Sequence, residues 1–375
     1  MKELKIIVPE NAKELGEKIQ KHLNELRNND ENYVLHMNNH GLIRFNNGEG
    51  KCVIEESIRD KDLYILSDVS NRSVTYSLCG ETHRIAPDEH FMDVLRILSA
   101  ECGHASKRTL VMPYLYGSRQ DRKESRESLD CAMALQILVN MGIDEIVTCD
   151  VHNKGVMNAV PKTPFENVYL TDTLLTDLIL TEGIFDYENI ICISPDEGAM
   201  KRARFFSEVI DNAKMAAFYK YRDQKVFNGN AKVREHRFLG DTDDLIGKIA
   251  IVTDDMIDTG GSILDTAKQL KELGVSKVYL VTTFAFFSKG IQKFNEYYEC
   301  GYLDRVYTTN LAYVPEEAKN KPWFKSVDCS RNMAYIINEL NHGRSIGEVI
   351  KGRDAVLKRV REIRTEKRNG QNEIK

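Results

Sequence analysis

Two adjacent carboxylates and a glycine-containing loop lie in the middle of the chain. Asp254 and Asp255 follow an apolar, β-branched run at residues 248–253, which is typical of a buried strand. An apolar-periodic helix follows the loop and ends at Gly274. The loop residues between the carboxylates and this helix are Asp258, Thr259, Gly260, Gly261 and Ser262.

These residue types could bind a phosphate group. Hydroxyl side chains, a backbone that glycine leaves open and a helix N-terminus are all phosphate-binding features. The carboxylates beside them could hold sugar hydroxyls or a metal ion. An ordinary turn at the start of a helix uses the same residue types, so this segment alone leaves both interpretations open.

Other charged residues also follow predicted strands. Four cations, Arg119, Arg122, Lys123 and Arg126, come after a strand expected at residues 108–114. An anionic ligand at the carboxyl end of a parallel strand is a common arrangement, although a run of charges is also typical of a solvated surface. Lys220 and Arg222 are spaced i and i+2 on a predicted strand, so both side chains project to one face and could reach a single phosphate.

Composition limits the class of protein. The 375 residues are 42% hydrophobic, which is enough for two domains with substantial cores. A net charge of −5 argues against a basic surface for nucleic acid or membrane, and no apolar run approaches the roughly 20 residues that span a bilayer. Eight cysteines without a C-x-x-C pair, and a start without a cleavable apolar region, predict a cytoplasmic protein with reduced thiols.

Strands and helices alternate along the chain. Strands are expected at residues 5–8, 33–37, 51–54, 63–66, 108–114, 165–170, 190–193, 214–219, 248–253, 278–284 and 306–309, with another ending at Cys149. Helices are expected at residues 11–26, 91–98, 130–141, 173–180, 263–273, from Ser288 and at 328–352, with Asn11 as the cap of the first. Residues 69–87 are interpreted as a surface insertion, 223–245 as a mobile lid and 353–375 as a charged, fraying extension.

The central segment VTDDMIDTGGS, residues 252–262, resembles a loop of known families. Type I phosphoribosyltransferases and ribose-phosphate diphosphokinases share this phosphoribosyl-diphosphate-binding loop. It grips the 5-phosphate of ribose, and its acidic pair lies along the ribose hydroxyls. The resemblance therefore implies ribose 5-phosphate binding by Asp254 and Asp255 and by the loop residues Asp258, Thr259, Gly260, Gly261 and Ser262.

Two more segments separate the two families. RQDR, residues 119–122, resembles the ATP-binding loop of ribose-phosphate diphosphokinases, which ordinary phosphoribosyltransferases lack; here the loop is about two residues shorter, and Gly-Ser replaces Tyr-Ala before it. RFNNGE, residues 44–49, resembles the hairpin that contacts the adenine of ATP in a neighbouring subunit, with Asn47 in place of an acid. ATP binding is thereby implied for Phe45, Asn47, Glu49, Arg119, Gln120 and Arg122.

The remaining motifs occur in the family's order. CDVH, residues 149–152, is similar to the family's VDLH, which implies that His152 approaches Mg²⁺; SPDEGAMKRA, residues 194–203, is similar to SPDxGGxxRA, which makes Asp196 the second metal ligand. KYR, residues 220–222, matches KxR, whose Lys220 and Arg222 would be the catalytic cations that stabilise the transferring phosphoryl group. The chain is identified as a member of the ribose-phosphate diphosphokinase family.

The resemblance implies a reaction, a fold and an assembly. ATP and ribose 5-phosphate would give AMP and 5-phosphoribosyl 1-diphosphate, with Mg²⁺ as cofactor. The fold would be α/β, with two similar type I phosphoribosyltransferase-like domains, each a mostly parallel sheet flanked by helices. The N-terminal domain would span residues 1–165, with helix 328–352 packed on it, and the C-terminal domain 166–327. The family's assembly is a homo-oligomer in which dimers build a hexamer.

Two alternatives remain open. A catalytically silent regulatory homologue would keep the fold without turnover; Asn47 and the altered loops permit it, whereas the intact Lys220 and Arg222 argue against it. A base phosphoribosyltransferase would release diphosphate from phosphoribosyl diphosphate, but the Arg119 loop and the duplicated architecture argue against it.

Overall fold

In a computed structural model, the chain divides into two compact units. The structure describes residues 2–38, 40–184, 187–210, 212–222, 233–347 and 362. Unit 1 comprises Met1–Leu170, Asn310–Tyr313 and Asp328–Ile350, and unit 2 comprises Thr171–Thr309, Val314–Val327 and Lys351–Lys375.

Unit 1 is built on a six-stranded parallel sheet in the order β10-β9-β8-β5-β1-β2. Its strands are β1 (Leu4–Pro9), β2 (Val34–Met37), β5 (Asp62–Leu66), β8 (Lys107–Val111), β9 (Glu145–Cys149) and β10 (Phe165–Val168). Its helices are α1 (Lys13–Arg27), α2 (Pro87–Glu101), α3 (Asp130–Asn140) and α9 (Ser330–Asn341). Strands β1, β5 and β9 are buried along their whole length, as expected for parallel strands covered on both faces. Residues 165–168, expected to begin the second half of the chain, instead form the edge strand β10 of this first sheet.

Two antiparallel hairpins extend unit 1. The first pairs β3 (Leu42–Arg44) with β4 (Gly50–Cys52), and the second pairs β6 (Thr75–Leu78) with β7 (Glu81–Arg84). The second hairpin lies within the insertion at residues 69–87, where no strand or helix was predicted.

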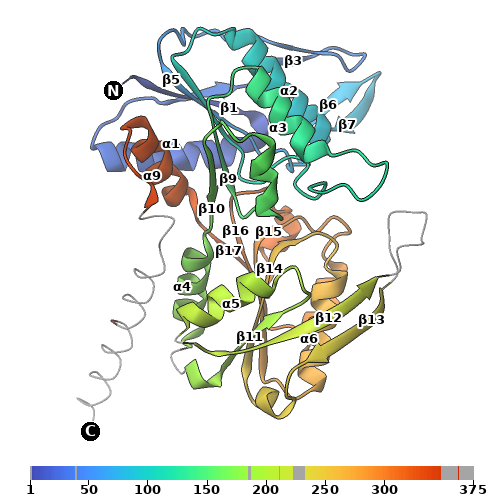
Figure 1. Ribbon diagram of the computed structural model, residues 1–375. Coiled ribbons are helices and arrows are strands. Elements are labelled where there is room, and N and C mark those ends of the chain that lie inside the picture. The colour runs from blue at the N-terminus through green and yellow to red at the C-terminus, as the bar shows by residue number, and fades with distance from the viewer. Residues whose placement is uncertain are drawn as a thin grey trace. The chain divides into compact units, whose positions relative to one another are not determined.

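Segments from the end of the chain return to unit 1. Helix α9 packs on α1 (Figure 1). At this contact, Nε and Nη2 of Arg27 donate hydrogen bonds to Oδ1 of Asn338 and Asn341 at 2.9 and 2.8 Å. The backbone N–H of Tyr313 donates to Oδ2 of Asp68 at 2.6 Å, and burial raises the pKa of Asp68 to about 6. The predicted helix over 328–352 is too long, because α9 ends at Asn341; residues 348–352, and all of the tail except residue 362, lie outside the described part.

Unit 2 contains a seven-stranded sheet in the order β13-β12-β11-β14-β15-β16-β17. Its strands are β11 (Ile190–Ser194), β12 (Lys214–Arg222), β13 (Val233–Leu239), β14 (Ile249–Ile257), β15 (Lys277–Ala285), β16 (Arg305–Thr309) and β17 (Phe324–Val327). All described pairs are parallel except β12 with β13. The predicted lid at 223–245 is therefore wrong in part, because β13 pairs with β12 in the sheet; residues 223–232 lie outside the described part.

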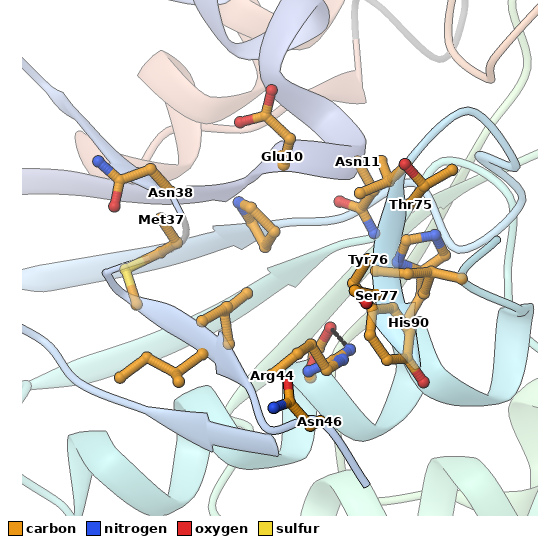
Figure 2. A pocket seen from close by; sticks show the side chains of 16 residues that line it. Glu10, Asn11, Met37, Asn38, Arg44, Asn46, Thr75, Tyr76, Ser77 and His90 are labelled. Atoms are coloured by element: carbon orange, nitrogen blue, oxygen red, sulfur yellow. Dashed lines mark hydrogen bonds and ion pairs between the residues drawn. The ribbon is translucent and has the colours of Figure 1, made fainter. Parts of the chain in front are cut away.

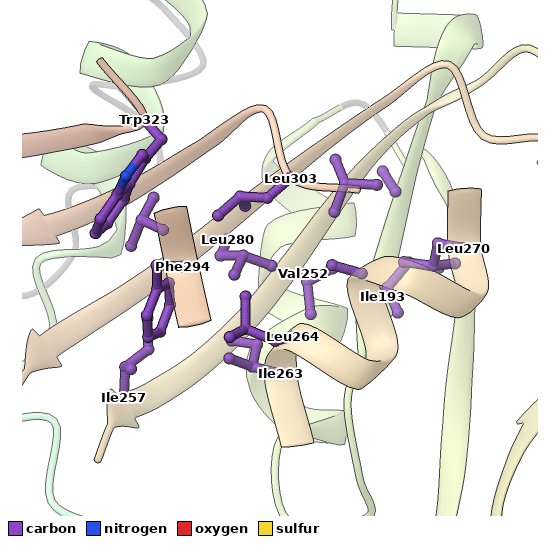
Figure 3. Packing of buried hydrophobic residues seen from close by; sticks show 14 of the residues in the cluster. Ile193, Val252, Ile257, Ile263, Leu264, Leu270, Leu280, Phe294, Leu303 and Trp323 are labelled. Carbon is purple, nitrogen blue, oxygen red and sulfur yellow. The ribbon is translucent and has the colours of Figure 1, made fainter. Parts of the chain in front are cut away.

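One face of this sheet packs against a hydrophobic cluster, shown in Figure 3. Val252 and Leu280 from the strands meet Leu264 and Leu270 of α6, and the stacked rings of Phe294 and Trp323 belong to the same cluster. The helices of unit 2 are α4 (Thr171–Glu182), α5 (Met200–Val209), α6 (Gly261–Glu272), α7 (Gln292–Glu299) and α8 (Glu316–Lys319). This core fixes α6, and with it the loop that precedes α6, against the sheet.

Two helix starts differ from the sequence prediction. Asn11 does not cap α1; it lies in the short 3-10 helix η1 (Glu10–Ala12), and its Nδ2 donates to Oγ of Ser67 at 3.1 Å. The helix expected from Ser288 begins at Gln292, because the N–H of Ser288 donates to the carbonyl oxygen of Asp258 and holds the chain in a loop. The other 3-10 helices are η2 (Lys154–Ala159), η3 (Tyr187–Asn189) and η4 (Asp243–Leu245).

The predicted fold class is confirmed. Each unit is a mostly parallel sheet flanked by helices. None of the helices in the described part of the chain has the length and hydropathy needed to cross a membrane. All eight cysteines lie in the described part, and each is a free thiol.

Candidate functional site

The two central carboxylates lie within strand β14 rather than after it. The strand continues to Ile257, beyond the end predicted at Thr253. Because side chains alternate along a strand, the two carboxylates differ in exposure: Asp255 is buried at 3%, whereas the Asp254 side chain keeps 26% of its surface accessible. Asp254 is therefore the member of the pair that a ligand can reach from solvent.

The loop after β14 leads directly into the N-terminus of α6. Gly260 is the N-cap residue of the helix at φ +80° and brings no side chain of its own to the helix start. A Cβ at Gly260 would lie 2.3 Å from Cζ of Phe294, so only glycine fits this close approach. The first N–H groups of a helix have no acceptor within the helix, and the positive end of the helix dipole lies there. This arrangement can bind a phosphate group.

Asp258 is held beside this loop by hydrogen bonds. The hydroxyl of Ser288 donates to Oδ1 of Asp258 at 2.5 Å, and the N–H of Ser288 donates to its carbonyl oxygen at 2.9 Å. Thr259 and Ser262 are half-buried in the same turn. The structure thus brings all five predicted loop residues to one end of β14.

Asp196 lies at the same edge of the sheet, in the turn after β11. Its Oδ1 accepts hydrogen bonds from the N–H groups of Gly198 and Ala199 at 3.0 and 3.3 Å. Because β11 and β14 are parallel neighbours, the turn that carries Asp196 and the last residues of β14, which include Asp254, lie at the same carboxyl edge of the sheet. The turn fixes the orientation of the Asp196 carboxylate.

The negative charges at this edge repel one another. The pKa of Asp254 is raised well above its usual value by burial first, and then by the charges of Asp255 and Asp196. Nη1 of Arg202 lies 3.9 Å from Oδ1 of Asp254 and opposes this effect. A cation bound here would relieve the remaining repulsion.

The end of β12 adds the two predicted catalytic cations. Strand β12 is the other parallel neighbour of β11 and ends at Arg222, so the backbones of Lys220 and Arg222 lie at the edge that carries Asp196 and Asp254. That both side chains project to one face stays a prediction, since the register with β13 shifts between Tyr221 and Arg222. The side chains of Lys220 and Arg222 lie outside the described residues.

In unit 1, two predicted segments follow neighbouring parallel strands. The Arg119 loop comes after β8, and exposed His152 comes after β9. Gly117 has φ +71° and allows a turn, in which the N–H of Gln120 donates to the carbonyl oxygen of Gly117 at 2.8 Å. Arg119, Gln120 and Arg122 are all exposed. The loop therefore presents two cations and an amide to solvent at the carboxyl edge of the sheet.

The remaining predicted nucleotide-binding residues form the tip of the β3–β4 hairpin. The N–H of Phe45 donates to the carbonyl oxygen of Glu49 at 2.8 Å, and Gly48 turns the chain at φ +91°. Nδ2 of Asn47 donates to Oε2 of Glu49 at 2.9 Å. The Phe45 ring is 49% exposed, so one of its faces is available for stacking.

The carboxylates of unit 2 fit the predicted magnesium ion. Mg²⁺ prefers oxygen ligands and is often bound by one or two carboxylates together with phosphates and water. Asp196 and Asp254 could supply such a donor pair; burial, and after it the charges of Asp255 and Asp196, raise the pKa of Asp254. Within the described residues, no group of three or more His, Cys, Asp or Glu side chains is placed to hold a metal.

Three residues that the sequence did not single out contact the predicted phosphate-binding loop or Asp254; the loop, residues 258–262, is called the phosphate cradle below. Arg202 approaches Asp254, Ser288 binds Asp258, and Phe294 packs on Gly260. Arg202 could have been found, because it lies in the recognised segment at 194–203. Ser288 and Phe294 gave no local signal, because they meet the loop only through the packing of β15 and α7.

Comparisons with known protein families agree with this geometry. Residues 4–142 match the model of the N-terminal domain of ribose phosphate pyrophosphokinase, and residues 230–351 match the phosphoribosyl synthetase-associated domain.

Individual relatives cover most of the chain. The chain is 31% identical over 278 residues to ribose-phosphate pyrophosphokinase from Synechococcus elongatus, covering 73% of this chain and 75% of the relative. It is 29% identical over 309 residues to ribose-phosphate pyrophosphokinase A from Dictyostelium discoideum, covering 82% and 88%. A crystal structure of phosphoribosylpyrophosphate synthetase from Mycobacterium smegmatis superposes with a TM-score of 0.73 at 25% identity, covering 91% of this chain and all of that one.

Proposed function

Because the chain belongs to the ribose-phosphate pyrophosphokinase family, we propose that it transfers the diphosphoryl group of ATP to the anomeric hydroxyl of ribose 5-phosphate. The products would be AMP and 5-phosphoribosyl 1-diphosphate. One observation carries the proposal: the glycine-led N-terminus of α6 follows β14, which carries Asp254, at the strand edge that also receives Asp196 and the end of β12.

Ribose 5-phosphate is assigned to unit 2. Its phosphate would accept hydrogen bonds from the N–H groups at the start of α6 and from the hydroxyls of Thr259 and Ser262. Asp254 would accept hydrogen bonds from the ribose hydroxyls, since its carboxylate is the accessible one of the pair. Asp255 is buried and would act by positioning β14, and Asp258 would complete the loop.

ATP is assigned to residues of unit 1. The exposed ring of Phe45 would stack on the adenine, and Glu49 and Asn47 would contact its polar edge. Arg119, Gln120 and Arg122 would hold the phosphates, since all three are exposed residues whose side chains donate hydrogen bonds.

The proposed chemistry is one in-line displacement. The anomeric oxygen of ribose 5-phosphate forms a bond to the β-phosphorus of ATP, and the bond from that phosphorus to the oxygen bridging the α-phosphate breaks, so AMP leaves. The hydroxyl proton passes to solvent or to a nearby carboxylate. Lys220 and Arg222 would stabilise the charge that grows on the phosphoryl oxygens, and no covalent enzyme intermediate is needed.

A divalent cation belongs to this proposal. We assign His152 and Asp196 as the residues that would hold Mg²⁺, which would supply neutralisation of the phosphate charge. Asp254 would lie close to the same charge, which would offset the repulsion from Asp255 and Asp196 that adds to the effect of burial on its pKa.

Assembly and location are part of the proposal as well. The β3–β4 hairpin would serve a neighbouring copy of the chain, so the working enzyme would be a homo-oligomer built from dimers, with a hexamer as the expected size. The eight free thiols support a reducing compartment such as the cytoplasm.

A coupled product assay tests the proposed function. Purified full-length protein mixed with ATP, Mg²⁺ and ribose 5-phosphate should form AMP and 5-phosphoribosyl 1-diphosphate in equal amounts. Absence of both products over a wide range of Mg²⁺ would overturn the proposal and favour a silent regulatory homologue. Release of diphosphate from phosphoribosyl diphosphate with a purine or pyrimidine would instead identify a base phosphoribosyltransferase.

A further inference from the structure

A cavity of about 320 Å³ lies in unit 1, between the two hairpins and the segment that joins β1 to α1. Figure 2 shows the side chains that line it. Its walls come from the segment after β1, the end of β2, the base of the β3–β4 hairpin and the insertion at 69–87. None of its lining residues has a role in the reaction proposed above. Its volume is at the lower end of the range for small-molecule sites, roughly 300–1,000 Å³.

One polar atom of the cavity wall lacks a partner. Asn11 is 4% exposed, and its Nδ2 donates to Oγ of Ser67, but its Oδ1 accepts no hydrogen bond. A buried acceptor without a donor is costly, and most native structures satisfy such an atom. Asn11 lines the cavity, so a ligand inside could supply the missing donor.

The charges at the cavity wall are already balanced. Nη1 and Nη2 of Arg44 donate to the two carboxylate oxygens of Asp93 at 2.7 and 2.5 Å, and Arg96 also binds Asp93. Nε2 of His90 hydrogen-bonds to the carbonyl oxygen of Asn71, and burial lowers the pKa of His90, which keeps it neutral at pH 7. The cavity therefore offers no unpaired cation to a phosphate group.

The rest of the lining combines apolar side chains with small polar groups. Met37, Leu42, Ile43, Val74 and Ile85 form apolar parts of the wall, and Asn38, Asn46, Thr75 and Ser77 add amides and hydroxyls. Such a wall matches a flat heterocycle, whose faces are apolar and whose edge carries hydrogen-bonding groups. A free sugar would leave several hydroxyls against apolar side chains.

We propose that this cavity binds a neutral nucleobase or nucleoside, which donates a hydrogen bond from a ring or amino N–H to Oδ1 of Asn11. The ligand is uncharged because Arg44 and Asp93 already neutralise each other and leave no charge at the wall for a ligand to balance. The cavity is a second binding site, separate from the residues assigned to ATP and ribose 5-phosphate.

Ligand binding here would act on the β3–β4 hairpin. Arg44 and Asn46 belong to the cavity wall and flank Phe45 in the chain. The insertion holds the hairpin from the other side, because the N–H of Cys79 donates to the carbonyl oxygen of Asn46 at 2.7 Å and the Arg44 guanidinium lies 5.5 Å from the Tyr76 ring centroid. An occupied cavity would therefore steady the hairpin, and, if the proposed function holds, lower the KM for ATP.

Direct binding tests the site without any assay of turnover. Full-length protein is titrated by calorimetry with adenosine, guanosine, cytidine and uridine separately, with ribose and AMP as comparison ligands. At least one nucleoside should saturate one site per chain, while ribose should not bind. A Phe45→Ala variant should keep this binding, because Phe45 belongs to the proposed ATP site and not to the cavity. Loss of nucleoside binding in that variant would assign the signal to the ATP site and overturn the proposal.

Two cavity variants and two matched controls locate the site. Asn11→Leu removes the acceptor and should weaken nucleoside binding about tenfold or more, whereas Asn29→Leu removes another unpartnered Asn Oδ1 outside the cavity and should not. Val74→Phe fills the cavity from a half-buried position and should abolish binding, whereas Val53→Phe enlarges a half-buried valine that does not line it.

The outcomes separate the two proposals. Equal nucleoside affinity in wild type, Asn11→Leu and Val74→Phe, each checked for folding by its melting temperature, would exclude the cavity. A lack of saturation by all four nucleosides would mean that the cavity holds water only. Because calorimetry needs no catalysis, nucleoside binding would stand even if no diphosphoryl transfer were found.

Discussion

A Cβ atom added to Gly260 would lie 2.3 Å from Cζ of Phe294 and 2.5 Å from its Cε2, so the ring of α7 fixes the path of the backbone that begins α6. Gly260 also has φ +80°, which side-chain-bearing residues rarely adopt. The geometry of the proposed phosphate-binding loop thus depends on Phe294, which lies 34 positions beyond Gly260 in the chain.

Gly260→Ala should therefore reduce both stability and ribose 5-phosphate binding. The contact with Phe294 and the left-handed backbone should each cost on the order of 1–3 kcal/mol. Gly247→Ala is the matched control, because Gly247 has φ +74° with no atom within 4 Å of an added Cβ. Urea unfolding should show the larger loss for Gly260→Ala, and calorimetry should show weaker ribose 5-phosphate binding in that variant only. Equal losses in both variants would mean that the Phe294 contact is unimportant.

Asp254→Asn should stabilise the protein at pH 7 in the absence of Mg²⁺. A carboxyl group whose pKa is raised by folding binds its proton more tightly in the folded chain, so stability falls as the pH rises from about 3.9 through the raised value. An increase of one unit in the pKa of the folded state corresponds to about 1.4 kcal/mol of stability lost at high pH. The gain from Asp254→Asn should be present at pH 7 and vanish at pH values below the unfolded pKa.

Thermal unfolding at several pH values, with and without Mg²⁺, measures this effect. Mg²⁺ should raise the melting temperature of wild type and have little effect on Asp254→Asn. Asp243→Asn, at an exposed carboxylate of η4, is the control and should match wild type. A lower melting temperature for Asp254→Asn than for wild type at pH 7 would contradict this prediction, because it would show that the folded protein stabilises the Asp254 carboxylate.

Lys220→Ala and Arg222→Ala should each lower kcat about 10²–10³-fold while ribose 5-phosphate still binds, because a cation aimed at transition-state charge contributes several kcal/mol. Lys214→Ala, at the other end of β12, removes an exposed cation paired with Asp244 and should leave kcat unchanged. Steady-state kinetics together with calorimetry separates the two effects. A normal kcat for Lys220→Ala would remove this lysine from the proposed mechanism.

Phe45→Ala should raise the KM for ATP about tenfold with no change in melting temperature. The ring is 49% exposed, and stacking on a base contributes roughly 1–3 kcal/mol. Met92→Ala, at an exposed apolar residue of α2, is the control for loss of surface area. An unchanged KM would show that the hairpin tip does not contact the nucleotide.

Mixing two impaired variants tests whether the hairpin serves a neighbouring copy. If Phe45 and Lys220 of one site come from different chains, co-assembly of Phe45→Ala with Lys220→Ala restores both residues in a fraction of the sites. Activity of the mixture should then exceed the mean of the two variants alone. Activity equal to that mean would place both residues in one chain.

The sequence alone predicted the elements whose signal lies in neighbouring residues. Period-two and period-3.6 apolar patterns located most strands and helices, because burial of one face or both leaves a signal in neighbouring residues. The motifs at 194–203 and 252–262 indicated which strand ends carry charged and phosphate-binding groups, because a turn after a strand has a narrow set of acceptable residues.

The tertiary structure decided the features that depend on distant partners. Strand β14 extends through Asp254 and Asp255 because β15 continues to pair with it, and β13 forms because β12 offers an antiparallel edge. Asn11 leaves the cap of α1 for Ser67, 56 residues away. No local pattern contains these pairings, since each gains its free energy only after the chain has brought the two segments together. The phosphate cradle is the clearest case: its glycine is visible in the sequence, but the Phe294 ring that makes glycine necessary is known only from the fold.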